Sequence, residues 1–468
     1  MRPRQSGLQP QRVLLLVAFA FAVMADPVSS VAYAIEAALR ALDGDLGLLL
    51  PTMTMVIAVI AVVTLNYHQI VARYPAGGGA AAAVGDAFGE RWAFVPIAAL
   101  VVDFTLTIAI SAAAGASAII AYLPALGGWR LPLALALIVG VAGLTWFGHL
   151  GRAVFATMTL TFLALAVVVL VYGLAAHPQP QATSVPATSS PAAAVVLAFP
   201  VAMALATGVE APASAIAQLD QLDGTGRRRF GRITLWLTLA IVGIITLGLT
   251  AQAVHLRIGV PGPDSTQIAE LARIAAPGPV FAAFQLATTL LLLSAASSSF
   301  QAGPGLLKAL AAGHDSAEPS LGILPAGLGR TNSHYTPYWG VLIFVVGSAA
   351  LVTAAGGNDQ RLVLFYAVAV FLSFLAGMLA MTRLSYRARQ PATLAVNAAG
   401  ALVVGFTLAV NLTRGAPLAS MAATGLIALI LHRLWVRSGR PSGIQQASCQ
   451  CQVTRTAPGL ARRAKGKG

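Results

Sequence analysis

The sequence predicts an all-α membrane protein that crosses the bilayer many times, and three observations support this class. Hydrophobic residues make up 57% of the 468 residues, charged residues only 9%, and the mean hydropathy is +0.80. A soluble domain carries about 25% charged residues, so an ordinary soluble fold is excluded. Apolar runs of about 20 residues recur along the chain, as membrane-spanning helices require. These runs do not alternate apolar and polar residues, which excludes a transmembrane β-barrel.

Twelve apolar segments, separated by polar or Pro/Gly-rich breakers, are predicted to span the membrane. They lie at 13–40, 47–71, 92–122, 131–149, 152–176, 192–219, 233–254, 279–300, 338–355, 361–382, 393–412 and 417–436. The Gly/Ala-rich segment 76–88 is too short to span and is expected to form a re-entrant or interfacial helix. The 301–335 connection is expected to be a surface loop with at most one short helix.

The distribution of basic residues predicts that both termini lie in the cytoplasm. With the N-terminus inside, most of the 29 Lys and Arg residues fall in inner connections or in the C-terminal tail. The basic residues on the outer side are Arg40, Arg130, Arg257, Arg273, Arg361 and Arg414. The net charge of +14 therefore reflects orientation in a cell membrane, and nucleic acid is not an expected partner.

A few carboxylates lie inside the apolar spans, where no Lys or Arg occupies a span core to neutralise them. They are Asp26, Asp103 and Glu210, with Glu36 on the outer half of the first span. A charged side chain is costly in hydrocarbon, so each acid indicates a functional site.

Two of these acids lie where a span is interrupted by proline or glycine. In Ala25–Ser30, Pro27 removes a backbone donor and disfavours helical geometry at Asp26, so freed carbonyls are expected to face a cavity. The sixth span has a similar interruption at Ala206–Pro212. Matching breaks in spans one and six predict two five-helix repeats with a site near the membrane midplane. The alternative is that these residues only kink the helices.

The third span adds polar groups on one helix face, because Asp103, Thr107 and Ser111 are four residues apart. For Ser111, packing between helices is an equally good interpretation. Together the carboxyls, hydroxyls and freed carbonyls predict an all-oxygen site, which suits a hard cation. Three ionised carboxylates around one monovalent ion repel each other, so at least one acid is expected to take up a proton.

Five motifs then carry a resemblance to a known family. They are Asp26-Pro27-Val28-Ser29-Ser30-Val31-Ala32-Tyr33, Tyr74-Pro75-Ala76-Gly77-Gly78-Gly79, Asp103-Phe104-Thr105-Leu106-Thr107, Thr207-Gly208-Val209-Glu210 and Tyr366-Ala367-Val368-Ala369-Val370-Phe371. Over roughly 13–382 the chain resembles the amino acid–polyamine–cation superfamily, and within it the KimA-type potassium/proton symporters. This resemblance implies a LeuT-like fold of two inverted five-helix repeats plus two further helices.

The resemblance also implies roles for single residues. The cation path would be lined by Asp26, Tyr33, Asp103, Thr107, Ser111 and Thr207. Glu210 would be the proton-coupling acid, and Tyr366 would close the site. Phe104 departs from the family, which usually has Tyr there. No cofactor is expected, and no metal beyond the transported cation.

The expected organisation is a cytoplasmic N-terminus (1–12), a ten-helix transport core (13–382), two further helices (383–436) and a short basic cytoplasmic tail (437–468). The expected function is proton-coupled import of a monovalent cation, potassium, by alternating access, without enzymatic activity. A proton-coupled amino acid or polyamine permease is the alternative, although the break at Asp26-Pro27 lacks the glycines that bind an α-carboxylate. A homodimer stays open.

Overall fold

The computed structural model describes residues 10–148, 151–179, 190–219, 222–311 and 321–444, and helices account for most of them. Within these residues, ten helical segments are long and apolar enough to cross a membrane, and two shorter apolar helices cover Val13–Val23 and Tyr338–Ala354. Every segment that the sequence predicts to span contains at least one of these helices. The predicted all-helical class is therefore confirmed for the described residues.

The elements follow one another along the chain without a named β-strand in the described ranges. The α-helices are α1 (Pro10–Val23), α2 (Ala25–Ser29), α3 (Val31–Ala41), α4 (Leu46–Arg73), α5 (Gly79–Phe88), α6 (Glu90–Tyr122), α7 (Arg130–Trp146), α8 (Arg152–Gly173), α9 (Pro191–Ala202), α10 (Ala211–Ala215), α11 (Gly224–His255), α12 (Gln267–Ala275), α13 (Gly278–Leu310), α14 (Tyr338–Ala354), α15 (Asp359–Arg387), α16 (Pro391–Leu412) and α17 (Ala416–Arg437). Short 3-10 helices are η1 (Pro124–Trp129), η2 (Met203–Ala206), η3 (Ile216–Gln218) and η4 (Ala326–Gly329).

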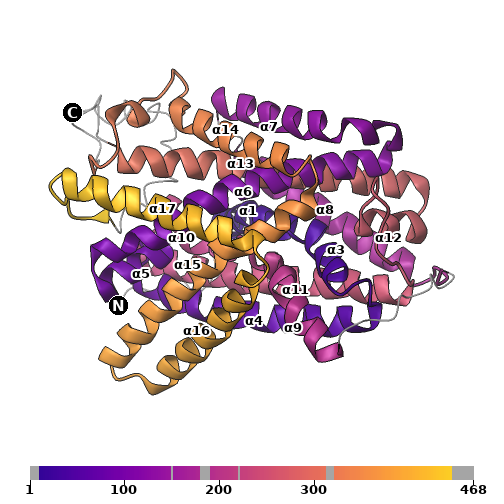
Figure 1. Ribbon diagram of the computed structural model, residues 1–468, viewed down its shortest axis with the longest axis horizontal. Helices are drawn as coiled ribbons and strands as arrows, with labels where there is room; N and C mark the ends of the chain where they lie inside the picture. Colours follow the sequence, from indigo (N-terminus) through magenta and orange to yellow (C-terminus); the bar gives the residue numbers. More distant parts are fainter. Residues whose placement is uncertain (1–9, 149–150, 180–189, 220–221, 312–320, 445–468) are drawn as a thin grey trace.

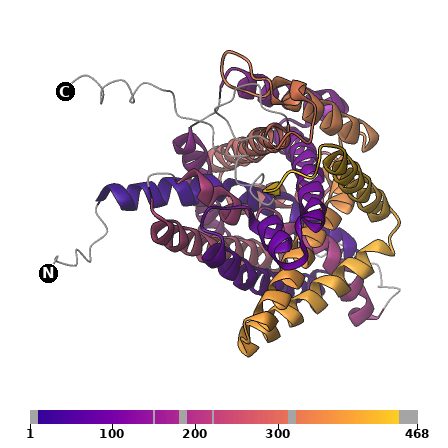
Figure 2. The same ribbon diagram turned by 90° about the vertical axis from the view of Figure 1, so that its left-hand side faces the viewer.

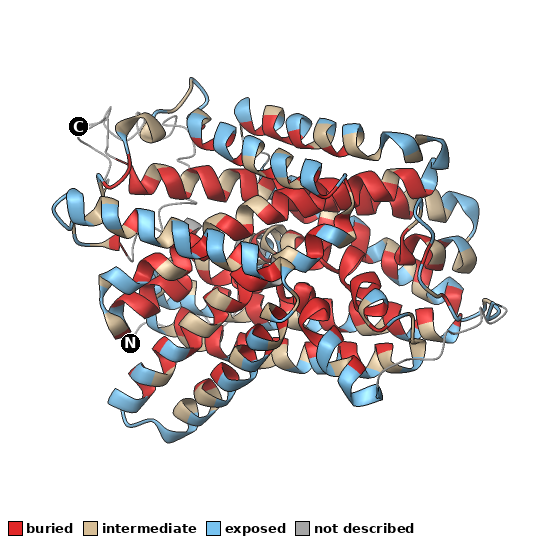
Figure 3. Cartoon of the chain, viewed as in Figure 1, coloured by how far each residue is buried: buried red, intermediate tan, exposed pale blue. Residues whose placement is uncertain are grey.

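The core of the bundle is the pair α6 and α13, which pack along each other (Figure 1). Each has 33 residues, or about 50 Å of helix, which exceeds the roughly 30 Å of membrane hydrocarbon. Most of their residues are buried, whereas α7, α14, α16 and α17 keep an exposed face (Figure 3). In the view turned by 90°, α16 and α17 lie at the edge of the bundle (Figure 2). This burial pattern fits helices whose apolar outer faces meet lipid.

The short helix predicted within 76–88, after the Tyr74-Pro75 motif, is present as α5, which packs against α15 and α6. Its position is fixed through the Tyr74 hydroxyl, which donates to Asp86 Oδ2 at 2.7 Å, and through Arg73, whose NH2 lies 3.1 Å from the same oxygen. Burial and the neighbouring carboxylate raise the pKa of Tyr74, so the phenol stays a donor at physiological pH. A re-entrant or interfacial placement of α5 stays a prediction.

Two connections differ from the sequence-based expectation. The surface loop expected from residue 301 begins later, because α13 continues to Leu310. At Gly303, which has no side chain, α13 packs directly on Phe344 of α14, and the helix continues through Pro304. The other difference is α12, which lies in the 255–278 connection where no helix is predicted.

Candidate functional site

The sixth apolar segment is unwound between η2 and α10. Thr207 is extended (φ −64°, ψ 142°), and Gly208 has a φ of 77°, in the left-handed region that favours glycine. The Thr207 hydroxyl donates to the Ala204 carbonyl at 3.1 Å, and Glu210 lies immediately before α10. Residues 207–210 of the predicted interruption at Ala206–Pro212 therefore lie outside the helices, between η2 and α10.

The first apolar segment is bent but keeps helical geometry, so the expectation that helix is lost at Asp26 is wrong. Asp26 lies inside α2, and the flanking Met24 and Ser30 both have right-handed helical dihedrals. The reason is the position of Pro27, which is the third residue of α2. The first N–H groups of a helix have no intrahelical partner, so a missing N–H there costs little. The next amide, of Val28, bonds the Met24 carbonyl at 3.0 Å.

The bent and the unwound segments lie against each other, although they are about 180 residues apart in the sequence. A Cβ added to Gly208 would be 2.8 Å from Pro27 Cδ and 2.9 Å from Asp26 Cγ, so only glycine fits at this contact. The Ser30 hydroxyl lies 2.7 Å from the Pro27 carbonyl and 3.2 Å from the Leu205 carbonyl, which joins the two segments. The structure thus brings both predicted breaks to one place.

The predicted acids gather around this junction. Asp26 is partly exposed, whereas Asp103 and Glu210 are 4% and 8% exposed. The charge of Asp26 acts on Glu210, and the charges of Asp26 and Asp103 both act on the Tyr33 phenol. Tyr33 is also within hydrogen-bonding range of the Thr207 side chain. We refer to Asp26, Tyr33, Asp103, Thr207 and Glu210, which are linked in pairs by these interactions, as the acidic cluster.

The remaining predicted residues are Thr107 and Ser111 on α6 and Tyr366 on α15. Thr107 and Ser111 are buried on the same helix as Asp103, with 2% and 1% exposure, on the face that the four-residue spacing predicts. Tyr366 lies on α15, but its side chain is outside the described part of the chain. Its predicted role in closing the site stays a prediction.

One acid near the cluster is missed by the sequence reasoning. Asp359 begins α15 and is 5% exposed, and its charge also acts on Tyr33. Its Oδ1 accepts a 2.8 Å hydrogen bond from Ser117 of α6, and the Ser117 hydroxyl in turn accepts one from Arg130 at 2.9 Å. The only sequence signal is its place directly before an apolar span, which is equally typical of a helix-capping acid.

Glu36, the acid on the outer half of the first span, has partners that explain its burial. Its Oε1 accepts from Arg40 Nε at 2.8 Å, and its Oε2 accepts from the Gln267 amide at the start of α12 at 3.0 Å. Glu36 thus anchors α12 over the C-terminal half of α3. Because α12 has only nine residues, it depends on such tertiary contacts, and the sequence alone does not predict it.

The cluster offers carboxylate, phenol and hydroxyl oxygens beside backbone that is not helical. Within the described residues, neither Asp26 nor Glu210 takes part in an ion pair, and Glu210 Oε2 is buried with no hydrogen-bond partner. No group of three or more His, Cys, Asp or Glu side chains suited to a metal ion occurs in the same ranges. An arrangement of this kind can attract a cation and hold a proton.

Comparison with known proteins agrees with this fold. The amino acid permease family matches residues 14–432. The chain belongs to this family. It is therefore a transporter of the amino acid–polyamine–cation superfamily, as its motifs predict. Its many apolar helices fit a multi-pass membrane protein.

A curated relative is the potassium transporter KimA of Bacillus subtilis (strain 168), which is 28% identical over 422 residues. The match covers 86% of this chain and 66% of KimA, just under two thirds of that protein. Among solved structures, a variant of the Eremococcus coleocola manganese transporter aligns with a TM-score of 0.49 at 14% identity, covering 94% of this chain and 96% of that one. The same transporter in complex with an aromatic bis-isothiourea substituted compound aligns with a TM-score of 0.49 at 14% identity, covering 92% and 96%.

Proposed function

We propose that this permease imports a monovalent cation, potassium, together with protons by alternating access. The observation that carries the proposal is the contact between the bent segment at Asp26 and the unwound segment at Gly208, two residues before Glu210. The proposed architecture has twelve spans, with two inverted five-helix repeats and two further helices. Both termini lie in the cytoplasm.

Each predicted residue has a proposed role in this cycle. The cation is bound by Asp26, Tyr33, Asp103, Thr107, Ser111 and Thr207, and Tyr366 closes the site from α15. Glu210 carries the coupled proton, because a buried carboxylate beside Asp26 can be ionised only when a cation balances the charge. Loss of the proton and binding of the cation are then linked.

Potassium is favoured over an α-amino acid by the backbone of the first segment. Its Met24 and Val28 amides already bond to helix carbonyls and Pro27 has no N–H, so few amides of this segment are left for an α-carboxylate. The 28% identity to a potassium transporter also supports a cation. The family match keeps a cationic amine or polyamine as the second candidate, because such substrates also suit a cluster of acids.

Growth at low potassium tests this function. The chain should restore growth to a host without potassium uptake, and Asp103→Asn should abolish the rescue at normal expression. Asp43→Asn is the matched control, because Asp43 is exposed in the turn after α3 and should keep the rescue. Failure of the intact protein to rescue, together with pH-driven amino acid or polyamine uptake in proteoliposomes, would reject potassium as the substrate.

A further inference from the structure

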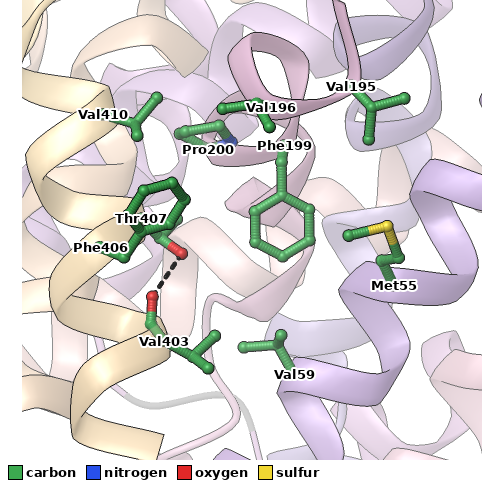
Figure 4. Close-up of a pocket in the computed structure, with 10 residues that line it drawn as sticks. All are labelled: Met55, Val59, Val195, Val196, Phe199, Pro200, Val403, Phe406, Thr407 and Val410. Atoms are coloured by element: carbon green, nitrogen blue, oxygen red, sulfur yellow. Dashed lines mark hydrogen bonds between the residues drawn. The ribbon is translucent and has the colours of Figure 1, made fainter. Parts of the chain in front are cut away.

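An apolar groove lies between three helices and is lined by none of the residues of the acidic cluster (Figure 4). It has a volume of about 150 Å³ and lies between α4, α9 and α16. Residues from all three helices line it, among them Met55, Val59, Phe199, Pro200, Val403 and Phe406. The Phe199 ring points into the space between α4 and α16 (Figure 4).

The lining of this groove suits a hydrocarbon chain. Phe406 is 60% exposed and Met55 49% exposed on helices that are apolar enough to lie in a membrane. The hydroxyl of Thr407 is satisfied within its own helix, since it donates to the Val403 carbonyl at 2.8 Å. The groove thus presents almost only carbon, and an occupant gains free energy there by burying apolar surface.

A positively charged side chain lies at one end of the groove. Arg414, in the turn between α16 and α17, donates from NH2 to the carbonyl of Leu197 on α9. Leu197 follows the lining residue Val196, and Arg414 is one helical turn beyond the lining residue Val410. The guanidinium is therefore next to the end of the groove, close to the predicted outer surface.

The hydrogen-bond donors at this end are incompletely satisfied by the protein. Within the described residues, Arg414 Nε and Asn411 Nδ2 are buried and have no hydrogen-bond partner, and no carboxylate forms an ion pair with Arg414. Burial lowers the pKa of Arg414, because its charge is partly removed from water without an anion beside it. Both groups are donors, so a ligand with acceptor oxygens and negative charge complements them.

We propose that this groove binds one anionic phospholipid, with an acyl chain between α4, α9 and α16 and the phosphate at Arg414. The apolar groove and the guanidinium at its end match the two parts of such a lipid. The site differs from the acidic cluster, and its occupation does not depend on which substrate the permease transports.

Native mass spectrometry of the full-length protein tests the proposal. It counts the phosphatidylglycerol and phosphatidylcholine molecules that stay bound, using lipids with the same acyl chains. The wild type should retain phosphatidylglycerol on the order of fivefold more tightly, as one Arg at the surface predicts. Arg414→Gln should lose this preference, since glutamine carries no charge. Arg361→Gln, an exposed arginine at the start of α15, should keep it. Millimolar inorganic phosphate should not displace the lipid, because it has no acyl chain.

A second pair of variants tests the groove itself. Val403→Trp fills it and should lose both bound lipids, whereas Leu402→Trp, on the neighbouring and 75% exposed position, should keep them. Melting temperatures close to wild type would show that both variants are folded. Equal lipid retention by the two Trp variants would overturn the proposal. A change from dimer to monomer in Val403→Trp with unchanged lipid binding would also overturn it, because the groove would then be a contact between copies.

Discussion

The two interrupted segments combine proline with a carboxylate, yet their backbones differ. Ala25–Ser30 keeps helical dihedrals at both flanks and bends at the junction of α1, α2 and α3. Thr207 and Gly208 leave the helical region altogether, and α10 begins only after Glu210. The difference shows that proline bends a helix when it falls at the start of a new one, whereas glycine allows real unwinding.

This contrast assigns different tasks to the two segments. The bent segment supplies side chains, with Asp26 on α2 and Tyr33 on α3. The unwound segment supplies the close contact at Gly208 and carries Glu210, and its Thr207 and Val209 amides make only long backbone hydrogen bonds, of 3.5 and 3.4 Å. Movement during transport is therefore expected mainly in the unwound segment.

The largest effect is expected from Gly208→Ala. A side chain at this position needs a left-handed backbone, which costs about 1–3 kcal/mol, and its Cβ would collide with Pro27. We expect lost growth at low potassium and a clearly lower melting temperature of the purified protein. Gly322→Ala is the matched control, because its φ of 67° carries the same strain but no atom lies within 4 Å. Equal effects of the two variants would show that the contact between the segments is unimportant.

A smaller effect is expected from Ser30→Ala, which removes the hydroxyl shared between the two segments. A hydrogen bond of this kind contributes about 1 kcal/mol. Ser29→Ala is the comparison, because the Ser29 hydroxyl is equally buried but donates only to the Asp26 carbonyl, at 2.7 Å, within its own segment. Denaturation of both variants should show the greater loss of stability for Ser30→Ala. The reverse order would mean that the bond to Leu205 does not join the segments.

The smallest effect is expected from Pro27→Ala. Because Pro27 lies where an N–H would have no helical partner, the substitution should cost only about 0.4–1 kcal/mol, through the freedom gained by the unfolded chain. Potassium-dependent growth should stay close to wild type. If growth is lost while the protein still folds, the bend at Asp26 depends on the proline itself.

Much of the fold could be predicted, because apolar periodicity and breakers are local properties of the sequence. The helices from α4 to α17 that fall in predicted spans show this, as does the break at Gly208, where the residue type limits the backbone. The backbone at Asp26 could not be predicted. Whether Pro27 breaks or begins a helix depends on where α2 starts, and the residues around Pro27 include Gly208, about 180 positions later in the sequence.

The candidate site was predictable in part for the same reason. Asp26, Asp103 and Glu210 stand out because a carboxylate is rare in an apolar span. Asp359 does not stand out, because its burial comes from Ser117, which lies 242 residues earlier in the sequence. Long-range contacts of this kind leave no pattern in a single sequence.

Ion flux in proteoliposomes tests the central proposal most directly. With purified protein and an imposed potassium gradient, protons should move with potassium in the wild type, and an imposed pH gradient should drive potassium uptake. In Glu210→Gln, potassium flux should no longer respond to the pH gradient, whereas Glu270→Gln, on α12 and paired with Arg273, should behave as wild type. Unchanged proton dependence in Glu210→Gln would remove this residue from coupling. A wild-type protein that moves a polyamine or an amino acid with protons, but no potassium, would contradict the account.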